Sequence, residues 1–468
     1  MRVLLINPPS GLYIREDRCQ VPVEGLSATA VRPPLDLAYL AAVAREKGAI
    51  ATIRDYPAAG ADWDAYARDL ADIKPSVLVV SVTTPTLAGD MDAVARAKAA
   101  GVALTIAKGA HFLTEAAKVL ADNPALDIAI VGEYEESFAD IITGMPLPEI
   151  AGIAWRENGA VRVNPMRGFI ADLNALPFPA RDLLDNDLYR RPDTGERQTT
   201  IQTNRGCPSN CIYCLAAPVS GRQLRLRSPE NIVAELRECV EQHGIRNFFF
   251  RADTFTINKP WVMAVCSAIA GSGLDIAWVC NSRVDTLDEA RLNMMKKAGC
   301  WLVSLGIEAG TEAGLQQIRK GTTLAQARAA VQLCRRIGIK TFCFYMVGLP
   351  WDDEASIAAT AAFARELDSD FAEFHIAVPF PKTNLLNIVQ REQLWQPGAD
   401  GKYDHAHPAI RTRHLSAARV EQLRRRALLR FYLRPRYIVR TLRHAGPAQF
   451  SNYVKFGCAT LKRLLLPD

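Results

Sequence analysis

Three cysteines with regular spacing lie close together near the middle of the chain. Cys207, Cys211 and Cys214 follow the pattern C-x3-C-x2-C. Thiolates on one tight loop can bind three irons of a 4Fe–4S cluster, which leaves the fourth iron open to a small chelating molecule. A zinc knuckle would need a fourth Cys or His nearby, and none follows until Cys239. Buried free thiols are the other alternative; we favour the cluster.

This spacing, with the aromatic Tyr213 directly before the third cysteine, resembles the radical S-adenosylmethionine (SAM) superfamily. The resemblance implies that the open iron holds the amino and carboxylate groups of SAM. It also implies that an electron from the cluster breaks a carbon–sulfur bond of SAM and produces a deoxyadenosyl radical. An electron donor such as flavodoxin or ferredoxin is therefore an expected partner.

A series of alternating strands and helices surrounds the cysteines and must position them. Apolar runs of strand length occur at 198–202, 247–251, 276–280, 301–307, 341–347 and 374–378. Stretches with helical spacing separate these runs. Six repeats predict a partial (β/α)6 radical SAM barrel, in which active-site residues lie at the carboxyl ends of the strands.

Polar or glycine-rich segments follow these strands. By the resemblance, SAM is bound by Asp253, Asn281, Arg283, Glu308, Gly348 and Pro350. We expect Glu308 to accept a hydrogen bond from the ribose or the ammonium of SAM, and Arg283 to pair with Glu308 or with the SAM carboxylate. The alternative for these two residues is a buried ion pair that ties adjacent strands together.

Two segments depart from the family's pattern. Lys382 stands where the family usually has glycine in Pro-Phe-Pro-Gly-Thr, and Trp351-Asp352-Asp353 follows Pro350 in place of Gly-Glu-Thr. Neither departure touches the cysteines. Both change the substrate side of the expected site, so the family's substrates do not transfer to this chain.

The first third of the chain predicts a second α/β unit. Strand-length apolar runs at 3–6, 51–53, 77–82, 103–106 and 128–131 alternate with helical stretches at 35–47, 67–73, 91–100 and 115–120. This order predicts an N-terminal doubly wound parallel sheet of the Rossmann-like type. Ligands of such sheets bind at the carboxyl ends of the strands.

Four loops at these strand ends, ahead of the cysteine motif, resemble the cobalamin-binding domain of cobalamin-dependent radical SAM enzymes. The residues that the resemblance places near cobalamin are Asn7, Ser81, Thr83, Thr84, Gly109, His111, Gly132 and Glu133. A generic flavodoxin-like domain, with ordinary turn and cap residues, is the alternative. The chain has no Asp-x-His-x-x-Gly motif, so we expect cobalt without a His ligand and His111 as a loop residue near the corrin.

Composition limits the remaining choices. The chain has 468 residues, 49% of them hydrophobic, and no run of about 18 apolar residues that would predict a transmembrane helix. Residues 1–9 form too short a stretch for a signal peptide, and their apolar run is expected to be the first strand. Eleven cysteines, most of them scattered in apolar surroundings, indicate core thiols and a reducing cytoplasm.

The chain is predicted to have four regions. These are the first α/β unit at 1–145, a hairpin and linker at 146–195, the radical SAM core at 196–395, and a basic helical region at 396–468.

The C-terminal region is strongly basic. Residues 411–468 carry a net charge of +12 in a chain whose total is +6. Between residues 423 and 442 the basic residues interleave with apolar ones, and Pro435 interrupts any helix there. Such a segment can lie on anionic membrane or dock on the acidic remainder of the protein. A nucleic-acid partner is not expected, since no recognition module is present.

Together the motifs predict an enzyme that uses a 4Fe–4S cluster, SAM and cobalamin. The resemblance implies methylation of an unactivated carbon of a small or lipid-like substrate through the deoxyadenosyl radical and methylcobalamin. Radical cyclisation or ring rearrangement without methyl transfer is an alternative, and a cobalamin or redox sensor is another. We expect the enzyme in the cytoplasm, and the basic region adds peripheral contact with the inner face of the membrane as an alternative to docking on the protein itself.

Overall fold

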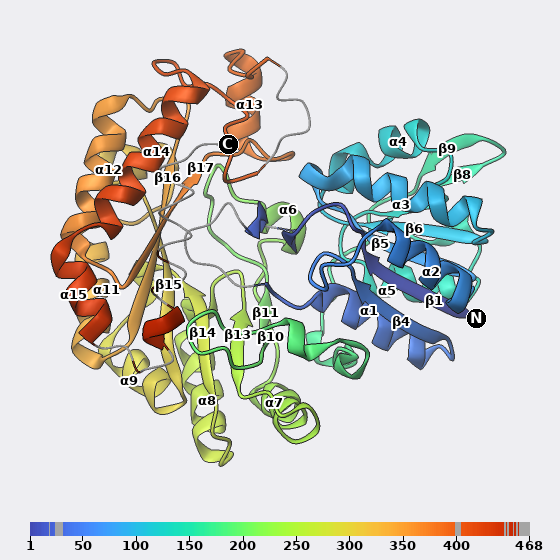
Figure 1. Ribbon diagram of the computed structural model, residues 1–468, viewed down its shortest axis with the longest axis horizontal. Helices are drawn as coiled ribbons and strands as arrows, with labels where there is room; N and C mark the ends of the chain where they lie inside the picture. Colours follow the sequence, from blue (N-terminus) through green and yellow to red (C-terminus); the bar gives the residue numbers. More distant parts are fainter. Residues whose placement is uncertain are drawn as a thin grey trace.

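The computed structural model describes residues 1–17, 19–23, 31–397, 404–443, 446, 449–452, 454 and 457. Within these residues the strands form two large sheets and two short two-stranded ladders. Figure 1 shows the two large sheets as units side by side, with the N-terminal unit on the right and the barrel on the left. The predicted α/β class, with a parallel sheet followed by a partial barrel, is confirmed.

The first sheet has the strand order β4-β1-β5-β6-β7-β8-β9. Its strands are β1 (Arg2–Asn7), β4 (Ile50–Asp55), β5 (Val77–Ser81), β6 (Leu104–Lys108), β7 (Ile128–Ile130), β8 (Ile153–Glu157) and β9 (Ala160–Val163). The helices are α1 (Leu35–Glu46), α2 (Trp63–Ile73), α3 (Leu87–Ala99), α4 (Phe112–Asp122) and α5 (Glu135–Ile142). One core packs α1 and α5 on one face, and a second packs α2, α3 and α4 on the other. The sheet is therefore covered on both faces, as its continuous apolar strands require.

Two hairpins modify this plan. The hairpin predicted within 146–195 does form, around a turn at Asn158 and Gly159 with φ of +50° and +82°. Its strand β8 pairs antiparallel with β7, so it extends the first sheet. A hairpin of β2 (Tyr13–Glu16) and β3 (Cys19–Pro22) follows β1 and had no counterpart in the sequence prediction.

The second sheet is parallel throughout, in the order β10-β13-β14-β15-β16-β17. Its strands are β10 (Gln198–Gln202), β13 (Asn247–Arg251), β14 (Ala277–Ser282), β15 (Cys300–Glu308), β16 (Lys340–Val347) and β17 (Phe371–Ile376). The helices in this part of the chain are α7 (Pro229–His243), α8 (Lys259–Gly271), α9 (Glu289–Lys297), α10 (Glu312–Gln317), α11 (Leu324–Ile337), α12 (Glu354–Leu367) and α13 (Asn384–Arg391). The strands β10 and β17 are the two edges, so the barrel is open.

Two C-terminal helices pack beside the edge strand β17. Helix α14 (Ala417–Tyr432) contacts β17 and α12, and α15 (Pro435–Arg443) begins at the proline that interrupts the basic segment. The side chain of Arg424 is buried and lies 3.1 Å from Glu373 of β17. The Tyr432 hydroxyl donates to the Ala372 carbonyl at 2.7 Å. This part of the basic region therefore docks on the barrel; its Lys455, Lys462 and Arg463 lie outside the described residues.

Most scattered cysteines are core residues, as predicted. The buried ones outside the cysteine motif are Cys239, Cys266, Cys280, Cys300, Cys334 and Cys343. Cys458 and the side chain of Cys19 are outside the described part of the structure. In the part of the chain that is described, no helix combines the length and apolar character needed to cross a membrane.

The backbone at Lys382 explains the glycine that the family's pattern has there. Lys382 has φ +61°, a left-handed conformation that costs a residue with a Cβ about 1–2 kcal/mol relative to glycine. Because glycine also loses more chain entropy on folding, we expect Lys382→Gly to raise the free energy of unfolding by about 0.5–1 kcal/mol. Lys382→Ala keeps the strain and serves as the control in urea titrations. Equal effects of the two substitutions would show that the strain is absent.

Candidate functional site

The three cysteines lie on a loop between two short paired strands. Strands β11 (Asn204–Arg205) and β12 (Arg225–Leu226) pair antiparallel and close the loop, which also contains α6 (Ala216–Ser220). Gly206 has φ +93°, and a Cβ there would lie 1.9 Å from the Gln223 carbonyl oxygen. Its amide donates to Asp253 Oδ2 at 2.6 Å. The end of β13 therefore anchors the cysteine loop, through the carboxylate that the sequence assigned to SAM.

The three thiols share one large cavity. Cys207, Cys211 and Cys214 all line a cavity of about 890 Å³, and all three are free thiols. Burial raises the pKa of Cys211, while nearby Lys320 acts in the opposite direction. The Ala216 amide donates to Cys214 Sγ at 3.4 Å, a contact that would stabilise a thiolate. Three thiol donors on one loop, facing one cavity, fit a 4Fe–4S cluster with an open iron.

Four of the six residues assigned to SAM line the cavity of these thiols, including Asp253, which holds the Gly206 amide. Asn281, Arg283 and Glu308 line the same cavity as the cysteines. Arg283 pairs with Asp285 at 2.8 Å and donates to Ser209 Oγ at 3.2 Å, so it does not pair with Glu308. Glu308 has φ +71° and is 8% exposed. A strained backbone at a buried acid beside a cavity is typical of a binding site.

Lys320, which the sequence analysis did not single out, is the ion-pair partner of Glu308. Its Nζ lies 2.8 Å from Glu308 Oε1 and 3.5 Å from the Tyr213 hydroxyl. Burial opposes the charge, but Glu308 and Cys211 raise the pKa of Lys320 above its usual value, so the ammonium stays charged. A Cβ on Gly306 would lie 2.4 Å from Glu308 Oε1, so glycine leaves the space for this pair. No local pattern marks Lys320, since its partner comes from another segment.

Gly348 and Pro350 are not brought to the cavity lining. Gly348 has φ +82°, and a Cβ there would lie 2.8 Å from Val420 of α14. The Pro350 carbonyl accepts from the Arg413 amide at 2.9 Å. The glycine thus makes room for the C-terminal helix.

The carboxyl edge of the first sheet is polar and buried. Asn7 is 5% exposed, and its Oδ1 has no partner among the described residues. The Thr83 amide and the Thr86 hydroxyl donate to Asp90 at 3.3 and 2.6 Å. The Ser81 carbonyl accepts from Arg15 at 2.8 Å. Part of the predicted hydrogen-bonding capacity of this loop is therefore used within the protein, whereas Asn7 Oδ1 is left for a ligand donor.

Gly109 and His111 lie on the neighbouring loop. Gly109 has φ +150°, and a Cβ there would lie 2.1 Å from the Val82 carbonyl oxygen, so glycine allows two loops to approach. His111 Nδ1 lies 3.2 Å from Thr84 Oγ1. Burial lowers the pKa of His111. The imidazole is therefore neutral and held beside Thr84, in keeping with its predicted place in a loop.

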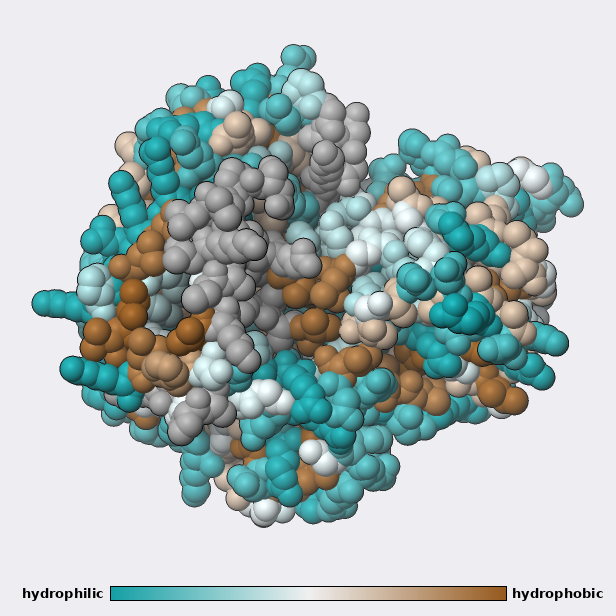
Figure 2. Space-filling model, in the orientation of Figure 1, coloured by the Kyte–Doolittle hydropathy of each residue, from teal (hydrophilic) through white to brown (hydrophobic). Residues whose placement is uncertain are grey.

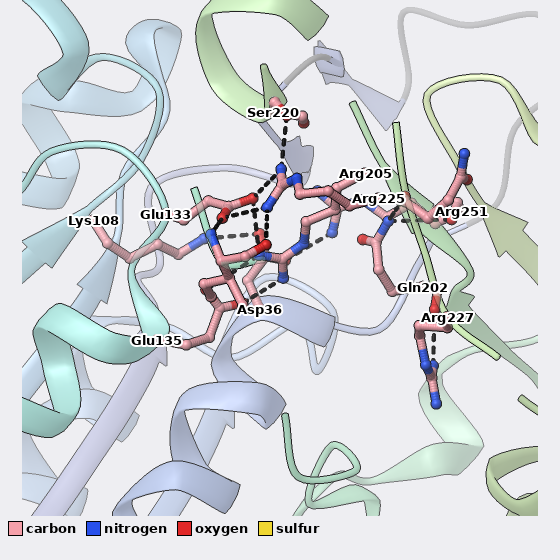
Figure 3. Close-up of polar contacts among 12 residues, drawn as sticks. Asp36, Lys108, Glu133, Glu135, Gln202, Arg205, Ser220, Arg225, Arg227 and Arg251 are labelled. Carbon is pink, nitrogen blue, oxygen red and sulfur yellow. Dashed lines mark hydrogen bonds and ion pairs between the residues drawn. The ribbon is translucent and has the colours of Figure 1, made fainter. Parts of the chain in front are cut away.

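The loop with Gly132 and Glu133 contacts protein from the other unit. Glu133 forms a bidentate pair with Arg225, at 2.8 Å for both oxygens, and lies 3.2 Å from Arg205 (Figure 3). The neighbouring Glu135 pairs with Arg205 as well. Burial opposes ionisation, but Arg225 and Arg205 hold the pKa of Glu133 below its usual value. Because Arg205 and Arg225 lie on β11 and β12, these pairs fasten the base of the cysteine loop to the first sheet.

A second buried link joins the strand ends of the two sheets. Asp36 Oδ2 lies 2.9 Å from Lys108 at the end of β6, and its Oδ1 lies 2.7 Å from Arg251 at the end of β13 (Figure 3). The carboxyl edges of the two sheets therefore face each other. Ile14 and Glu16, from the hairpin after β1, also line the cysteine cavity. The orphaned Asn7 amide oxygen and this facing edge fit a bound corrin next to the cluster.

Comparisons with known proteins agree with this architecture. Residues 201–364 match the model of the radical SAM superfamily. The chain is 31% identical to the uncharacterized methyltransferase PH0819 of Pyrococcus horikoshii, over 94% of this chain and 95% of that one. It is 27% identical to the anaerobic magnesium-protoporphyrin IX monomethyl ester cyclase of Rubrivivax gelatinosus, over 75% of this chain and 65% of that one.

A solved structure has the same fold over nearly the whole chain. The cobalamin-dependent SAM radical enzyme OxsB, with aqua-cobalamin and SAM bound, superposes with a TM-score of 0.72 at 16% identity, covering 99% of this chain and 72% of OxsB. The resemblance inferred from the cysteine loop and the strand-end loops is confirmed. The chain belongs to the radical SAM family that includes cobalamin-dependent methyltransferases and the anaerobic cyclases.

Proposed function

We propose that this protein is a cobalamin-dependent radical SAM methyltransferase that acts on an unactivated carbon of an organic substrate. The observation that carries the proposal is a single cavity lined by Cys207, Cys211 and Cys214 and by the hairpin after β1. This hairpin belongs to the unit assigned to the corrin, so that unit reaches the space at the cysteines, although the corrin residues named below do not themselves line the cavity. An enzyme needs such a shared space if radical formation and methyl transfer act on one substrate atom.

The chain's own residues have distinct roles in this proposal. Cys207, Cys211 and Cys214 hold the cluster, and Asn281, Arg283 and Glu308 bind SAM, with Lys320 fixing Glu308. Asp253 holds the cysteine loop and borders the SAM site. The corrin is bound by residues at the edge of the first sheet, namely Asn7, Ser81, Thr83, Thr84, Gly109 and His111. When bound, the cluster with SAM supplies the radical that removes a substrate hydrogen, and the corrin supplies the methyl group that replaces it.

Radical cyclisation without methyl transfer is the second candidate. It is supported by the similarity to the anaerobic cyclase of Rubrivivax gelatinosus. Both reactions use the same cluster and SAM residues, so the cavity alone does not separate them. The mass of the product does, because methylation adds a CH2 unit to the substrate and cyclisation does not.

The cluster assignment is tested with anaerobically reconstituted protein. We expect about four irons per chain and formation of deoxyadenosine from SAM after reduction. Ala in place of Cys207, Cys211 or Cys214 removes one of three thiolates and should abolish deoxyadenosine formation, whereas Cys239→Ala, a buried thiol away from the cavity, should not. SAM cleavage by the triple-Ala variant would refute the proposal. Absence of SAM cleavage by intact protein would favour a sensor.

The SAM site is tested at Glu308. If its carboxylate accepts a hydrogen bond from SAM, Glu308→Gln should weaken SAM binding by about 1–3 kcal/mol. The measurement is calorimetric titration of SAM into reconstituted protein. Glu366→Gln, which removes an exposed acid on α12, is the control. A loss of thermal stability with unchanged SAM affinity would show that Glu308 serves only its pair with Lys320.

We also propose peripheral membrane contact through α15, in an otherwise cytoplasmic protein that receives electrons from flavodoxin or ferredoxin. The support is a group of exposed apolar residues, Leu433 just before α15 and Ile438 and Val439 on it, with exposed Arg436 and Arg443 on the same helix. Leu433 and Ile438 also line the cavity at the cysteines, so this surface borders the cavity. Figure 2 shows apolar side chains gathered at the left of this face, over α15. We likewise propose the four regions 1–145, 146–195, 196–395 and 396–468 as the domain boundaries.

Vesicle flotation tests the membrane contact. The buried pair of Arg424 with Glu373 makes Arg424 unsuitable for substitution. We expect flotation with anionic vesicles at low salt, and its loss on Arg436→Glu with Arg443→Glu, because each cation near the surface contributes about 1 kcal/mol. Lys47→Glu with Arg68→Glu, exposed on the first unit, is the matched control. No flotation at low salt would retire the contact.

A further inference from the structure

The cavity at the cysteines continues through the inside of the barrel. Its lining includes residues near the amino ends of the strands, such as Trp301 of β15 and Phe371 of β17, and Leu429 and Tyr437 from α14 and α15. Residues 371 to 376 of β17 span about 17 Å at roughly 3.3 Å per residue. The space is therefore long enough for an extended molecule, with one end at the cysteine loop.

One wall of this space is a continuous row of rings. Phe371 contacts Phe342, Phe342 contacts Phe344, and Phe344 stacks on His375, with centroid distances of 6.0, 4.4 and 5.3 Å. The row continues to His405 at 5.0 Å and to Phe380 at 5.5 Å. Phe342, Phe344 and Phe371 remain partly exposed although they point into a barrel. Apolar surface that is left uncovered inside a cavity indicates an apolar ligand.

The charged groups deep in the barrel already have partners, whereas Lys382, which lines the same cavity, is exposed. Glu373 lies 3.1 Å from Arg424, Glu308 lies 2.8 Å from Lys320, and Arg191 lies 2.6 Å from Asp193. A charged ligand group deep in the barrel would have to compete with these pairs or stay uncompensated, at a large desolvation cost. The interior therefore favours an uncharged molecule.

Two imidazoles supply the polar part of the wall. His405 Nδ1 lies 3.1 Å from the Ile376 carbonyl oxygen, so this nitrogen carries the proton and Nε2 is an acceptor. None of the described residues hydrogen-bonds either nitrogen of His375, and its Nδ1 is buried. Burial lowers the pKa of both residues, so both rings are neutral. A neutral acceptor nitrogen beside an apolar wall suits a hydroxyl donor.

We propose that the barrel interior binds the substrate as an elongated, uncharged, mainly apolar molecule, with a hydroxyl group held by His375 and His405. This inference rests on the proposed function, because it assigns the substrate class of the same site. It places the hydroxyl near the carboxyl ends of β16 and β17, on the side of the cysteine loop, since His375 is level with Met346. The apolar body then lies along Phe344, Phe342 and Phe371.

Binding of simple probes to the reconstituted, SAM-bound enzyme tests the substrate class. Displacement of Nile red is followed with 1-dodecanol, dodecanoate, dodecylammonium, 1-methoxydodecane and 1-hexanol. We expect dodecanol to bind at least tenfold more tightly than either charged analogue, and hexanol at least a hundredfold more weakly than dodecanol, since each buried CH2 contributes roughly a factor of three to four. Equal affinity of alcohol and ions would overturn the proposal.

Substitutions locate the binding. His375→Phe and His405→Phe keep an aromatic ring and should each weaken dodecanol about five- to tenfold, with little effect on methoxydodecane, which has no donor. Ser304→Phe, which fills the space beside Phe342, should remove binding of both probes. His414→Phe, exposed on the surface, is the control. Unchanged dodecanol affinity in both His variants would refute the hydroxyl site, even if Ser304→Phe fails to fold.

The proposed function has its own readouts in the same samples. Iron content and deoxyadenosine formation are measured for every variant. Loss of dodecanol binding with iron content intact is the expected result for His375→Phe and His405→Phe. Intact iron and SAM cleavage in a protein that never binds dodecanol would overturn the substrate class and leave the radical SAM assignment standing. Loss of SAM cleavage in the intact protein would instead reject the proposed function.

Discussion

The buried ion pairs at the base of the cysteine loop are the contacts on which the rest of the site depends. Arg205 and Arg225 close the loop from β11 and β12, and their guanidinium groups bind Glu133 and Glu135 of the first unit (Figure 3). Removing one partner of such a buried pair costs about 3–5 kcal/mol, because the other charge is left unpaired. These ion pairs therefore hold the cysteine loop and the first sheet in one orientation, because separating the paired charges would require a large free energy.

The link through Asp36 gives this orientation its chemical consequence. Lys108 and Arg251 lie at the carboxyl ends of β6 and β13, where parallel sheets bind their ligands. A carboxylate shared by both cations brings two ligand-binding edges together. Arg251 is two residues from Asp253, whose carboxylate holds the Gly206 amide. The relative position of the two units is therefore transmitted through three short contacts to the residue before Cys207.

The sequence predicts what is local and misses what depends on distant partners. Strand β13 coincides with the apolar run predicted at 247–251. Helix α7 begins after its N-cap Ser228 and ends at Gly244, and α11 ends at Gly338, so each boundary is set by a residue next to it in the chain. Glu133, in contrast, stands in a strand-end loop that resembles a ligand contact, and only the fold shows its arginine partners. The same holds for Lys320, whose acid partner lies at the end of β15. Ion pairs between distant segments leave no periodic pattern in a sequence.

In the basic C-terminal region, too, the sequence did not reveal the ion-pair partners, and one of these partners lines the cavity of the barrel. Its net charge suggested a surface for anions, yet Arg424 is used on Glu373 inside the barrel, and Arg434 and Arg440 pair with Asp368. These pairs fasten α14 and α15 to β17 and its preceding turn. Because Glu373 lines the cavity beside the row of rings, Arg424 neutralises the one interior carboxylate of β17. The guanidinium of Arg424 therefore helps to make the barrel interior suitable for the uncharged substrate proposed above.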